Sequence, residues 1–446
     1  MMKQDWLSVW LAAALVSTGV ARARTLEEIL QEKGVIDASE AAEAKAAREK
    51  EQAATEKAVS SIPALPEWVK TITFFGDVRI RNESFFQDGS PDRIRQRFRL
   101  RFGAKVKPTD EIETGFKLSS GNPDDPISNN QTFTDEFTPK ELNIANAYIK
   151  LTPYKSIGLQ RPWVTLMGGK FDQPMYVPPT PNQLVFDPDL TPEGFYESLK
   201  VVDEKEGFLR TLALNLGQFI FQENSNTGEA AIYGFQGVGT AALGDALWTV
   251  GVADYHYVDP SSIAVARNTN SSLTITNFVT LSDGTVVGGK PVSPGTDAEG
   301  NPITITKFNS AFNDLDVATD VLIPTGMPAF PLRVFGDFVD NTETSSDDMG
   351  YQGGVTIGAS RDPGDFFFTY AYEYLETDAV VSAFTNSDYG RSGGTNTKAH
   401  ILQSGYTLTK NLSFLSTAWI DTPVDKVSGR NSNTDVRWQV DAIAKF

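Results

Sequence analysis

The last twelve residues, 435–446, alternate between apolar and polar side chains. Val436, Trp438 and Phe446 are among the even-numbered positions, which are all apolar. The odd-numbered positions are polar, with Ile443 as the exception. Side chains of a β-strand point alternately to its two faces, so this pattern predicts a strand with one apolar and one polar face.

The same period of two recurs from Lys70 onward. It predicts about sixteen amphipathic strands, each near the ~10 residues that a tilted membrane-spanning strand requires. The predicted strands are 70–84, 92–107, 110–120, 141–153, 162–171, 193–202, 206–221, 229–241, 244–257, 309–323, 329–340, 348–359, 364–377, 396–408, 411–420 and 434–446.

The connections between these strands alternate in length. Short turns such as 108–109 and 409–410 follow every second strand, and the other connections include longer loops. The longer loops are 121–140, 172–192, 258–308 and 378–395. Sorting of short turns and long loops to opposite rims is typical of an antiparallel β-barrel of the bacterial outer membrane. An even number of strands then places both ends of the barrel on the periplasmic, short-turn side.

The first 66 residues differ from the rest. An apolar run, Leu7–Val20, precedes Ala21-Arg22-Ala23, which predicts a cleaved signal peptide over 1–23. The run is too short for a comfortable membrane-spanning helix. Capping patterns and an Ala-rich stretch at 41–59 predict a short periplasmic helical segment over 24–66. That segment is either a solvated helix or a coiled coil that helps a trimer to assemble. The predicted barrel occupies 67–446.

Composition narrows the class further. The chain has no cysteine, so an exported form cannot rely on disulfides. Its net charge of −18 disfavours binding to nucleic acid. The two histidines, His256 and His400, lack a nucleophile motif or metal-ligand spacing, so we expect no catalytic residue, cofactor or metal site. The acidic pairs at 124–125 and 347–348 either bind calcium or bridge lipopolysaccharide, or are solvated loop acids.

The arginines of the second predicted strand occupy alternate positions and therefore lie on one face of it. A lipid-facing arginine at the bilayer midplane costs ~2–4 kcal/mol, so this face must line the lumen. The first strand carries Asp77, Arg79 and Arg81 on one face, and the last strand, which lies beside it in a closed barrel, adds Arg437 and Lys445. The predicted basic wall comprises Arg79, Arg81, Arg93, Arg95, Arg97, Arg99, Arg101 and Arg437. It is either a conduction surface or a polar interior neutralised by carboxylates.

The loop after the fifth strand, 172–192, is rich in proline and therefore stiff. It carries Asp187 and Asp189, with Glu193 just beyond. As constriction-loop acids opposite the arginines, these three residues would produce a transverse field across a pore. The alternative is an ordinary extracellular loop.

Several segments carry a resemblance to a known family. Gly169-Lys170-Phe171, the run 184–194, the run 405–412 and the terminal strand resemble the "putative porin" family of Gram-negative outer membranes. The element 29–36 is similar to the periplasmic leader of several porin families, including the phosphate-selective type. The resemblance implies a passive diffusion channel, and general porins of this size imply a homotrimer.

The function expected from these observations is an outer-membrane porin for small hydrophilic solutes or ions. A barrel of 16–18 strands leaves an aqueous channel. The expected partners are outer-membrane lipid, lipopolysaccharide and the barrel-assembly machinery, which would recognise Phe446. Short alternating runs at 272–278 and 303–307 predict an external hairpin, so the alternative function is an adhesion barrel that displays 258–308.

Overall fold

The computed structural model describes residues 46, 66–87, 89–223, 229–266, 275–277, 279–280, 286–287, 289–296, 302–388, 393–426 and 433–446. The expected signal peptide at 1–23 and nearly all of the expected helical segment at 24–66 lie outside these residues. Glu67–Phe446 forms one compact unit. Among the described residues, no helix is long and apolar enough to cross a membrane.

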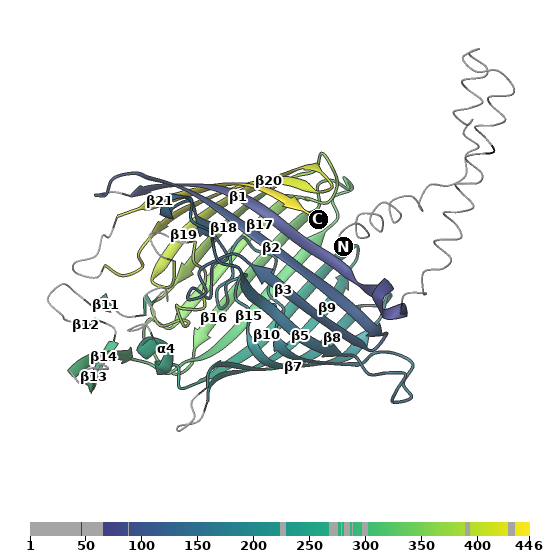
Figure 1. Ribbon diagram of the computed structural model, residues 1–446, viewed down its shortest axis with the longest axis horizontal. Helices are drawn as coiled ribbons and strands as arrows, with labels where there is room; N and C mark the ends of the chain where they lie inside the picture. The colour runs from purple at the N-terminus through teal and green to yellow at the C-terminus, as the bar shows by residue number, and fades with distance from the viewer. Residues whose placement is uncertain are drawn as a thin grey trace, which may run out of the picture. The chain divides into compact units, whose positions relative to one another are not determined.

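The unit is a closed antiparallel β-barrel of sixteen strands (Figure 1). Each strand pairs with its neighbour along the chain, and the last pairs with the first. The barrel strands are β1 (Thr73–Gln87), β2 (Arg93–Thr109), β3 (Ile112–Ser119), β5 (Asn143–Leu151), β6 (Val164–Lys170), β7 (Glu193–Asp203), β8 (Leu209–Gln222), β9 (Ala230–Leu243), β10 (Ala246–Val258), β15 (Asn313–Ile323), β16 (Leu332–Asn341), β17 (Met349–Gly358), β18 (Phe366–Leu375), β19 (Thr397–Thr409), β20 (Leu412–Thr422) and β21 (Asp435–Lys445).

Several shorter elements are not part of this ring of sixteen strands. They are η1 (Glu67–Thr71), β4 (Gln131–Thr132), η2 (Asp135–Phe137), α4 (Ser261–Ala266), β11 (Val279–Thr280), β12 (Val286–Val287), β13 (Gly289–Thr296) and β14 (Pro302–Phe308). The strand prediction is confirmed, with every predicted boundary within four residues of the observed one.

Closure of the barrel provides hydrogen-bond partners for the backbone of the first and last strands. Residues 77–87 of β1 pair with 435–445 of β21, and the backbones of Gly76 and Phe446 exchange hydrogen bonds of 3.0 and 3.1 Å. A membrane interior offers no water to unpaired amides, so a β-sheet is stable there only as a closed ladder of this kind.

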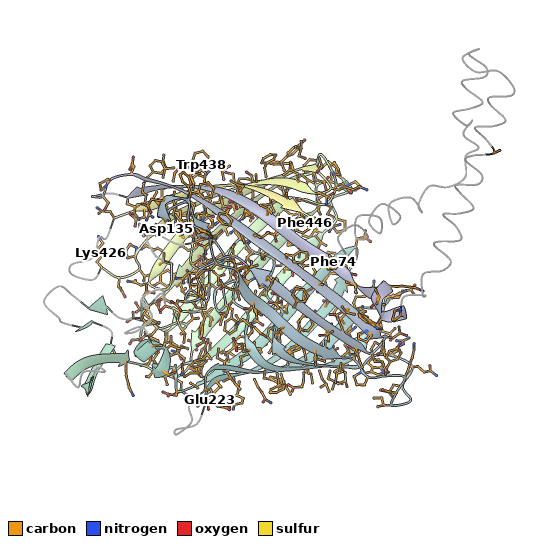
Figure 2. The ribbon with its side chains drawn as sticks, viewed as in Figure 1. Phe74, Asp135, Glu223, Lys426, Trp438 and Phe446 are labelled. Carbon is orange, nitrogen blue, oxygen red and sulfur yellow. The ribbon has the colours of Figure 1, made fainter. Side chains whose placement is uncertain are left out.

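The outer surface of the barrel is apolar. Along β1 the exposed Phe74, Val78 and Ile80 alternate with the buried Arg79 and other charged residues. Phe74, Trp438 and Phe446, which are labelled in Figure 2, belong to the same exposed apolar set. The period of two seen in the sequence therefore separates a lipid-facing surface from a charged lumen.

The connections sort by length as predicted. Two-residue turns at 110–111, 244–245 and 410–411 lie on one rim, here called the short-turn rim. The opposite rim, here called the long-loop rim, carries 120–142, 171–192, 259–312 and 376–396. Both the start of β1 and the end of β21 lie on the short-turn rim, as their pairing requires.

A hairpin is present within 258–308, but only one of its two strands is at a predicted run. Strands β13 and β14 pair antiparallel, and the predicted run 303–307 lies inside β14. The other predicted run, 272–278, lies partly outside the described residues, and 275–277 forms no strand. Instead, Asn277 Nδ2 donates to the carbonyl of Val380 at 2.8 Å, which ties this segment to the loop 376–396.

A hydrophobic core forms between the long loops and the inner face of the barrel. The loop residues Leu184, Phe186 and Val380 are at most 2 % exposed. They belong to one cluster with Ile232 and Tyr255, which alternate with outward-facing residues along β9 and β10. Part of the lumen is therefore filled by apolar loop residues. The two loops 171–192 and 376–396 are fixed inside the barrel by this burial.

Candidate functional site

Strands β1, β2 and β21 bring the predicted arginines together on the inner face. In the β1–β2 register Arg79 lies opposite Arg99 and Arg81 opposite Arg97. Arg437 of β21 lies opposite Phe85. Arg93 is exposed at the strand end, with its guanidinium 5.7 Å from the centre of the Phe85 ring. We call the eight predicted arginines the arginine wall.

Three carboxylates on the same strands hold these guanidiniums. Asp77 accepts from Arg99 Nη2 at 2.8 Å and from Arg101 Nε at 2.7 Å. Asp441 accepts a bidentate pair from Arg81, with Nε–Oδ1 at 2.7 Å and Nη2–Oδ2 at 2.8 Å. Paired carboxylates fix the planar guanidiniums in position.

Glu83 is the most buried of these carboxylates, with 0 % exposure. Its oxygens accept from Arg95 Nε at 2.5 Å, Arg437 Nη2 at 2.7 Å and Gln439 Nε2 at 2.9 Å. Sequence reasoning did not assign a role to Glu83 or Asp441. Both have the parity of the arginines on their strands, which is the signal that could have identified them.

Two loops on the long-loop rim supply further acids. Asp189 Oδ1 lies 3.7 Å from Nη1 of Arg99 and 3.7 Å from Nη1 of Arg101. Asp388, from the loop 376–396, lies 2.8 Å from Nη2 of Arg437. The sequence analysis predicted loop acids across a pore from the arginines. Asp189 instead contacts the arginines directly.

The other two predicted loop acids lie elsewhere. Asp187 has no ion pair with the wall, and its carboxylate accepts from the backbone amides of Asp189 at 2.7 Å and Ser387 at 3.2 Å. It thereby connects the two inward loops. Glu193 is the first residue of β7 and is 65 % exposed, with its carboxylate 3.0 Å from Nζ of Lys170. The structure does not bring Glu193 to the arginines.

The loop acids respond to this environment in opposite ways. Burial alone raises the pKa of the Asp189 carboxyl, but Arg99, Arg79 and Arg101 outweigh it and hold the pKa below its usual value. Burial, followed by the nearby charge of Asp189, raises the pKa of Asp187 well above its usual value. Asp189 therefore stays ionised at the wall, and Asp187 favours its protonated form more than an exposed aspartate does.

A third loop, 120–130, also folds inward, although the sequence indicated only a long outer loop there. Asn130 Oδ1 accepts from Arg79 Nη2 at 2.6 Å, and the backbone N–H of Asn129 donates to Asp189 Oδ2 at 3.3 Å. The chain then returns through β4, which pairs with β2 at Arg97 and Phe98. Three inward loops therefore meet at the arginine wall.

Acidic residues occupy the opposite side of the barrel. β15 and β2 are separated by seven strands in either direction around the ring. The buried acids on this side are Asp314, Asp316 and Asp320 of β15 and Asp337 of β16. We call them the acidic wall. The alternation of Asp314, Asp316 and Asp320 with outward-facing residues is visible in the sequence, but it was not interpreted as a lumen surface.

The proline-rich loop spans the distance between the two walls. Its Tyr176 hydroxyl donates to Asp320 at 2.7 Å, and Asn182 Nδ2 donates to Glu373 at 2.5 Å. Asp189, seven residues further along, lies at the arginine wall. The loop therefore crosses the lumen, with polar contacts at both ends and an apolar core between them.

The two histidines lie away from the lumen. His256 and His400 are exposed on the outer face of their strands. His400 Nδ1 is 2.9 Å from the Tyr370 hydroxyl, and His256 Nδ1 is 3.3 Å from Asn313 Oδ1. In the part of the chain that the structure describes, no group of three or more acidic, histidine or cysteine side chains could hold a metal ion.

A closed antiparallel barrel with an apolar outer surface and a charged lumen defines the class of outer-membrane channel proteins. The sequence matches the family described as "Putative porin" over residues 86–274 and 305–446. The chain belongs to this family. It is an outer-membrane porin that forms a channel for passive diffusion of small hydrophilic solutes.

The solved structure of one porin agrees at the level of the fold. The barrel resembles OprB of Pseudomonas putida in its high-pH structure, with 11 % identity, a TM-score of 0.53, and coverage of 85 % of this chain and 95 % of that one. OmpF of Salmonella typhi, solved in complex with daunomycin, has 9 % identity and a TM-score of 0.49 over 84 % of this chain and 97 % of that one. None of the curated proteins compared with the sequence matches it significantly.

Proposed function

We propose that the arginine wall and its acids make this porin weakly anion-selective. Among the described residues, seven arginines of the wall share five carboxylates through ion pairs, which leaves an excess of two positive charges, and Arg93, exposed at the strand end, adds a third. Unpaired lumen charge determines the local potential that a permeating ion experiences. This excess is the single observation that carries the proposal.

The acidic wall on the opposite side gives the lumen a transverse polarity. Facing surfaces of opposite sign orient dipolar solutes and disfavour apolar ones. The sequence analysis expected such a transverse field from the loop acids. Exposed charges are screened over about 8 Å at physiological salt, so the ion preference should weaken as ionic strength rises. We infer transport without catalysis, because the lumen chemistry consists of ion pairs that hold one another in place.

Liposome swelling tests the proposal. We expect vesicles containing the folded protein to swell in small neutral sugars, and faster in a small organic anion than in a cation of equal size. Faster swelling in the cation would contradict the selectivity, and an absence of swelling in every solute would contradict the channel.

We further propose that the protein works as a homotrimer. Glu197 faces outward on β7 between the exposed Phe195 and Leu199, and it pairs with Leu166 and Leu216 in the neighbouring strands. A carboxylate surrounded by lipid is unfavourable, whereas contact with a second copy would shield it.

Lipopolysaccharide and the barrel-assembly machinery remain the proposed partners in the outer membrane. Phe446 is exposed, and its ring lies 6.5 Å from that of Phe102. Deleting Phe446 should reduce the heat-modifiable, folded protein in the outer membrane. Undiminished assembly would contradict recognition through this residue.

A further inference from the structure

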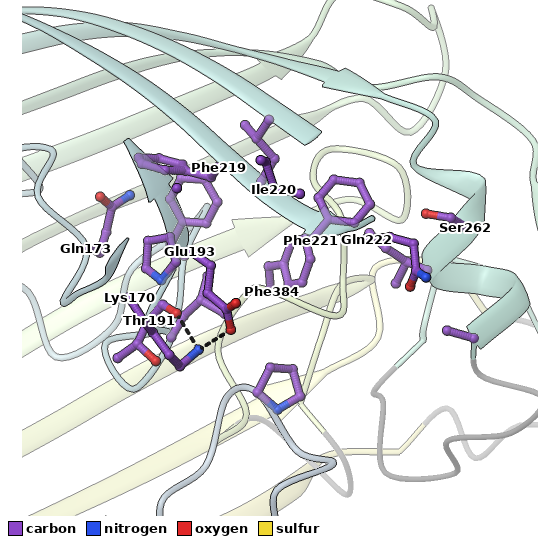
Figure 3. Close-up of a pocket in the computed structure, with 18 of the residues that line it drawn as sticks. Lys170, Gln173, Thr191, Glu193, Phe219, Ile220, Phe221, Gln222, Ser262 and Phe384 are labelled. Carbon is purple, nitrogen blue, oxygen red and sulfur yellow. Dashed lines mark hydrogen bonds and ion pairs between the residues drawn. The ribbon is translucent and has the colours of Figure 1, made fainter. Parts of the chain in front are cut away.

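A cavity of about 510 Å³ opens at the long-loop rim, apart from both charged walls (Figure 3). Its residues come from the ends of β6 to β9, the inward loops 120–130, 171–192 and 376–396, and α4. This volume lies within the range of ~300–1,000 Å³ typical of small-molecule sites. Neither the porin fold nor the arginine wall requires such a cavity.

The inner part of the cavity is aromatic. Phe186, Phe219 and Phe384 are at most 7 % exposed, and Phe221 lies edge-to-face with Phe384 at 5.8 Å between ring centres. Ile232 and Ile263 complete this apolar lining. Such a surface favours a flat apolar group, because a ring can stack on these aromatic side chains and leave water.

The outer part of the cavity is acidic. Asp124, Glu193 and Glu223 line it and are exposed, and Lys170 is the one basic residue among its described lining. Lys170 Nζ already donates to the Thr191 carbonyl at 2.9 Å and contacts Glu193 at 3.0 Å. The lining therefore carries an excess of negative charge at its mouth, next to aromatic faces that attract cations.

We propose that this cavity binds a small amphiphilic organic cation, with its apolar ring among Phe219, Phe221 and Phe384 and its ammonium group beside Glu193. Glu193 keeps one carboxylate oxygen for the ligand while the other contacts Lys170. The ring and the charge thus each find a matching part of one cavity.

Binding there would affect the channel. Phe186 and Leu190 line the cavity and belong to the loop 171–192 that also places Asp189 at the arginine wall. The positive excess of that wall opposes onward passage of a cation. A bound cation is therefore held at the long-loop rim and reduces the current, rather than being carried through.

Calorimetry on the detergent-solubilised, folded protein tests the site with three probes. Tryptamine has a ring and an ammonium group, indole-3-acetate has a ring and a carboxylate, and ethylamine has no ring. We expect tryptamine to bind roughly tenfold more tightly than either of the others. Indole-3-acetate or ethylamine binding as tightly as tryptamine would overturn the proposal.

Two substitutions and a matched control locate the site. Phe221→Ala and Glu193→Gln should each weaken tryptamine binding several-fold, by loss of the ring contact and of the charge respectively. Phe330→Ala, an exposed phenylalanine on the short-turn rim, should leave it unchanged. Wild-type affinity in both cavity variants would overturn the assignment. Calorimetry does not require conduction, so this result is independent of the proposed anion selectivity, which rests on the arginine wall.

Discussion

Asp388 and Arg437 join an inward loop to the strand that closes the barrel, with Oδ1 and Nη2 2.8 Å apart. Burial alone raises the pKa of Asp388, but Arg437 and Arg81 hold it well below its usual value, so the carboxylate is ionised at neutral pH. A loop acid thereby neutralises part of the positive charge of the lumen.

Removing that carboxylate should increase anion preference. Asp388→Asn raises the excess of positive charge at the wall by one while it keeps a side chain of similar shape. The reversal potential in a salt gradient should move further toward the anion limit. Glu343→Gln, an exposed acid on the same rim, is the matched control and should change nothing. An equal shift in both variants would mean that the effect is not local to the wall.

Glu83 should be the most costly acid to neutralise. It is fully buried and is held by Arg95 and Arg437, so Glu83→Gln leaves Arg95 without its ion-pair partner and Arg437 with Asp388 alone. Breaking a buried ion pair costs on the order of 3–5 kcal/mol, and the heat-modification temperature of the folded barrel should fall clearly. Asp110→Asn, which breaks an exposed turn contact with Lys155, should have no measurable effect. Equal stability of the two variants would contradict a structural role for Glu83.

The selectivity should depend on pH through Asp125. Burial raises the pKa of this residue in the inward loop 120–130 to about 6, and Arg97 and Asp189 are the charged groups acting on it. Below that pH the carboxyl is neutral and the positive excess is larger. As pH rises through about 6 it ionises, so anion preference should decrease. The Asp125→Asn variant should lose this step, and a step that persists in it would assign the titration to another group.

Glu197 should matter for assembly. If this outward carboxylate contacts a second copy, Glu197→Leu makes the surface compatible with lipid and weakens the trimer. Native mass measurement in mild detergent should show more monomer than in the wild type, whereas Val355→Leu, on the outer face of β17, should not. A wild-type protein that is only monomeric would contradict the trimer itself.

The strands and their faces could be predicted from the sequence, because the bilayer enforces the alternation at every position. The lumen-facing orientation of Arg79, Arg99 and Arg437 follows from the alternation of faces along their strands alone. The inward loops could not be predicted in the same way. The apolar run 379–384 is a local signal for burial, but its contacts are with segments about 100 to 200 residues away, such as Asn277 and Asp187.

The acids were harder to place for the same reason. Asp189 and Glu193 are four residues apart in the sequence, yet one contacts Arg99 and the other Lys170. The strand boundary of β7 separates them, and a loop can change direction where a strand cannot. Glu83 and the acidic wall, in contrast, had the parity of lumen residues and were accessible to sequence reasoning.

The most direct test of the account is the reversal potential of single channels in a salt gradient, compared between the wild type and the double variant Arg97→Gln, Arg101→Gln. This variant leaves Arg95 and Arg437 on Glu83 and Arg99 on Asp77. The exposed Arg361→Gln on the short-turn rim is the control. We expect an anion-selective wild type, an unchanged control and a double variant whose reversal potential has moved toward the cation limit, because two positive charges of the wall are gone. A double variant that keeps the wild-type reversal potential would show that the arginine wall does not line the conducting path.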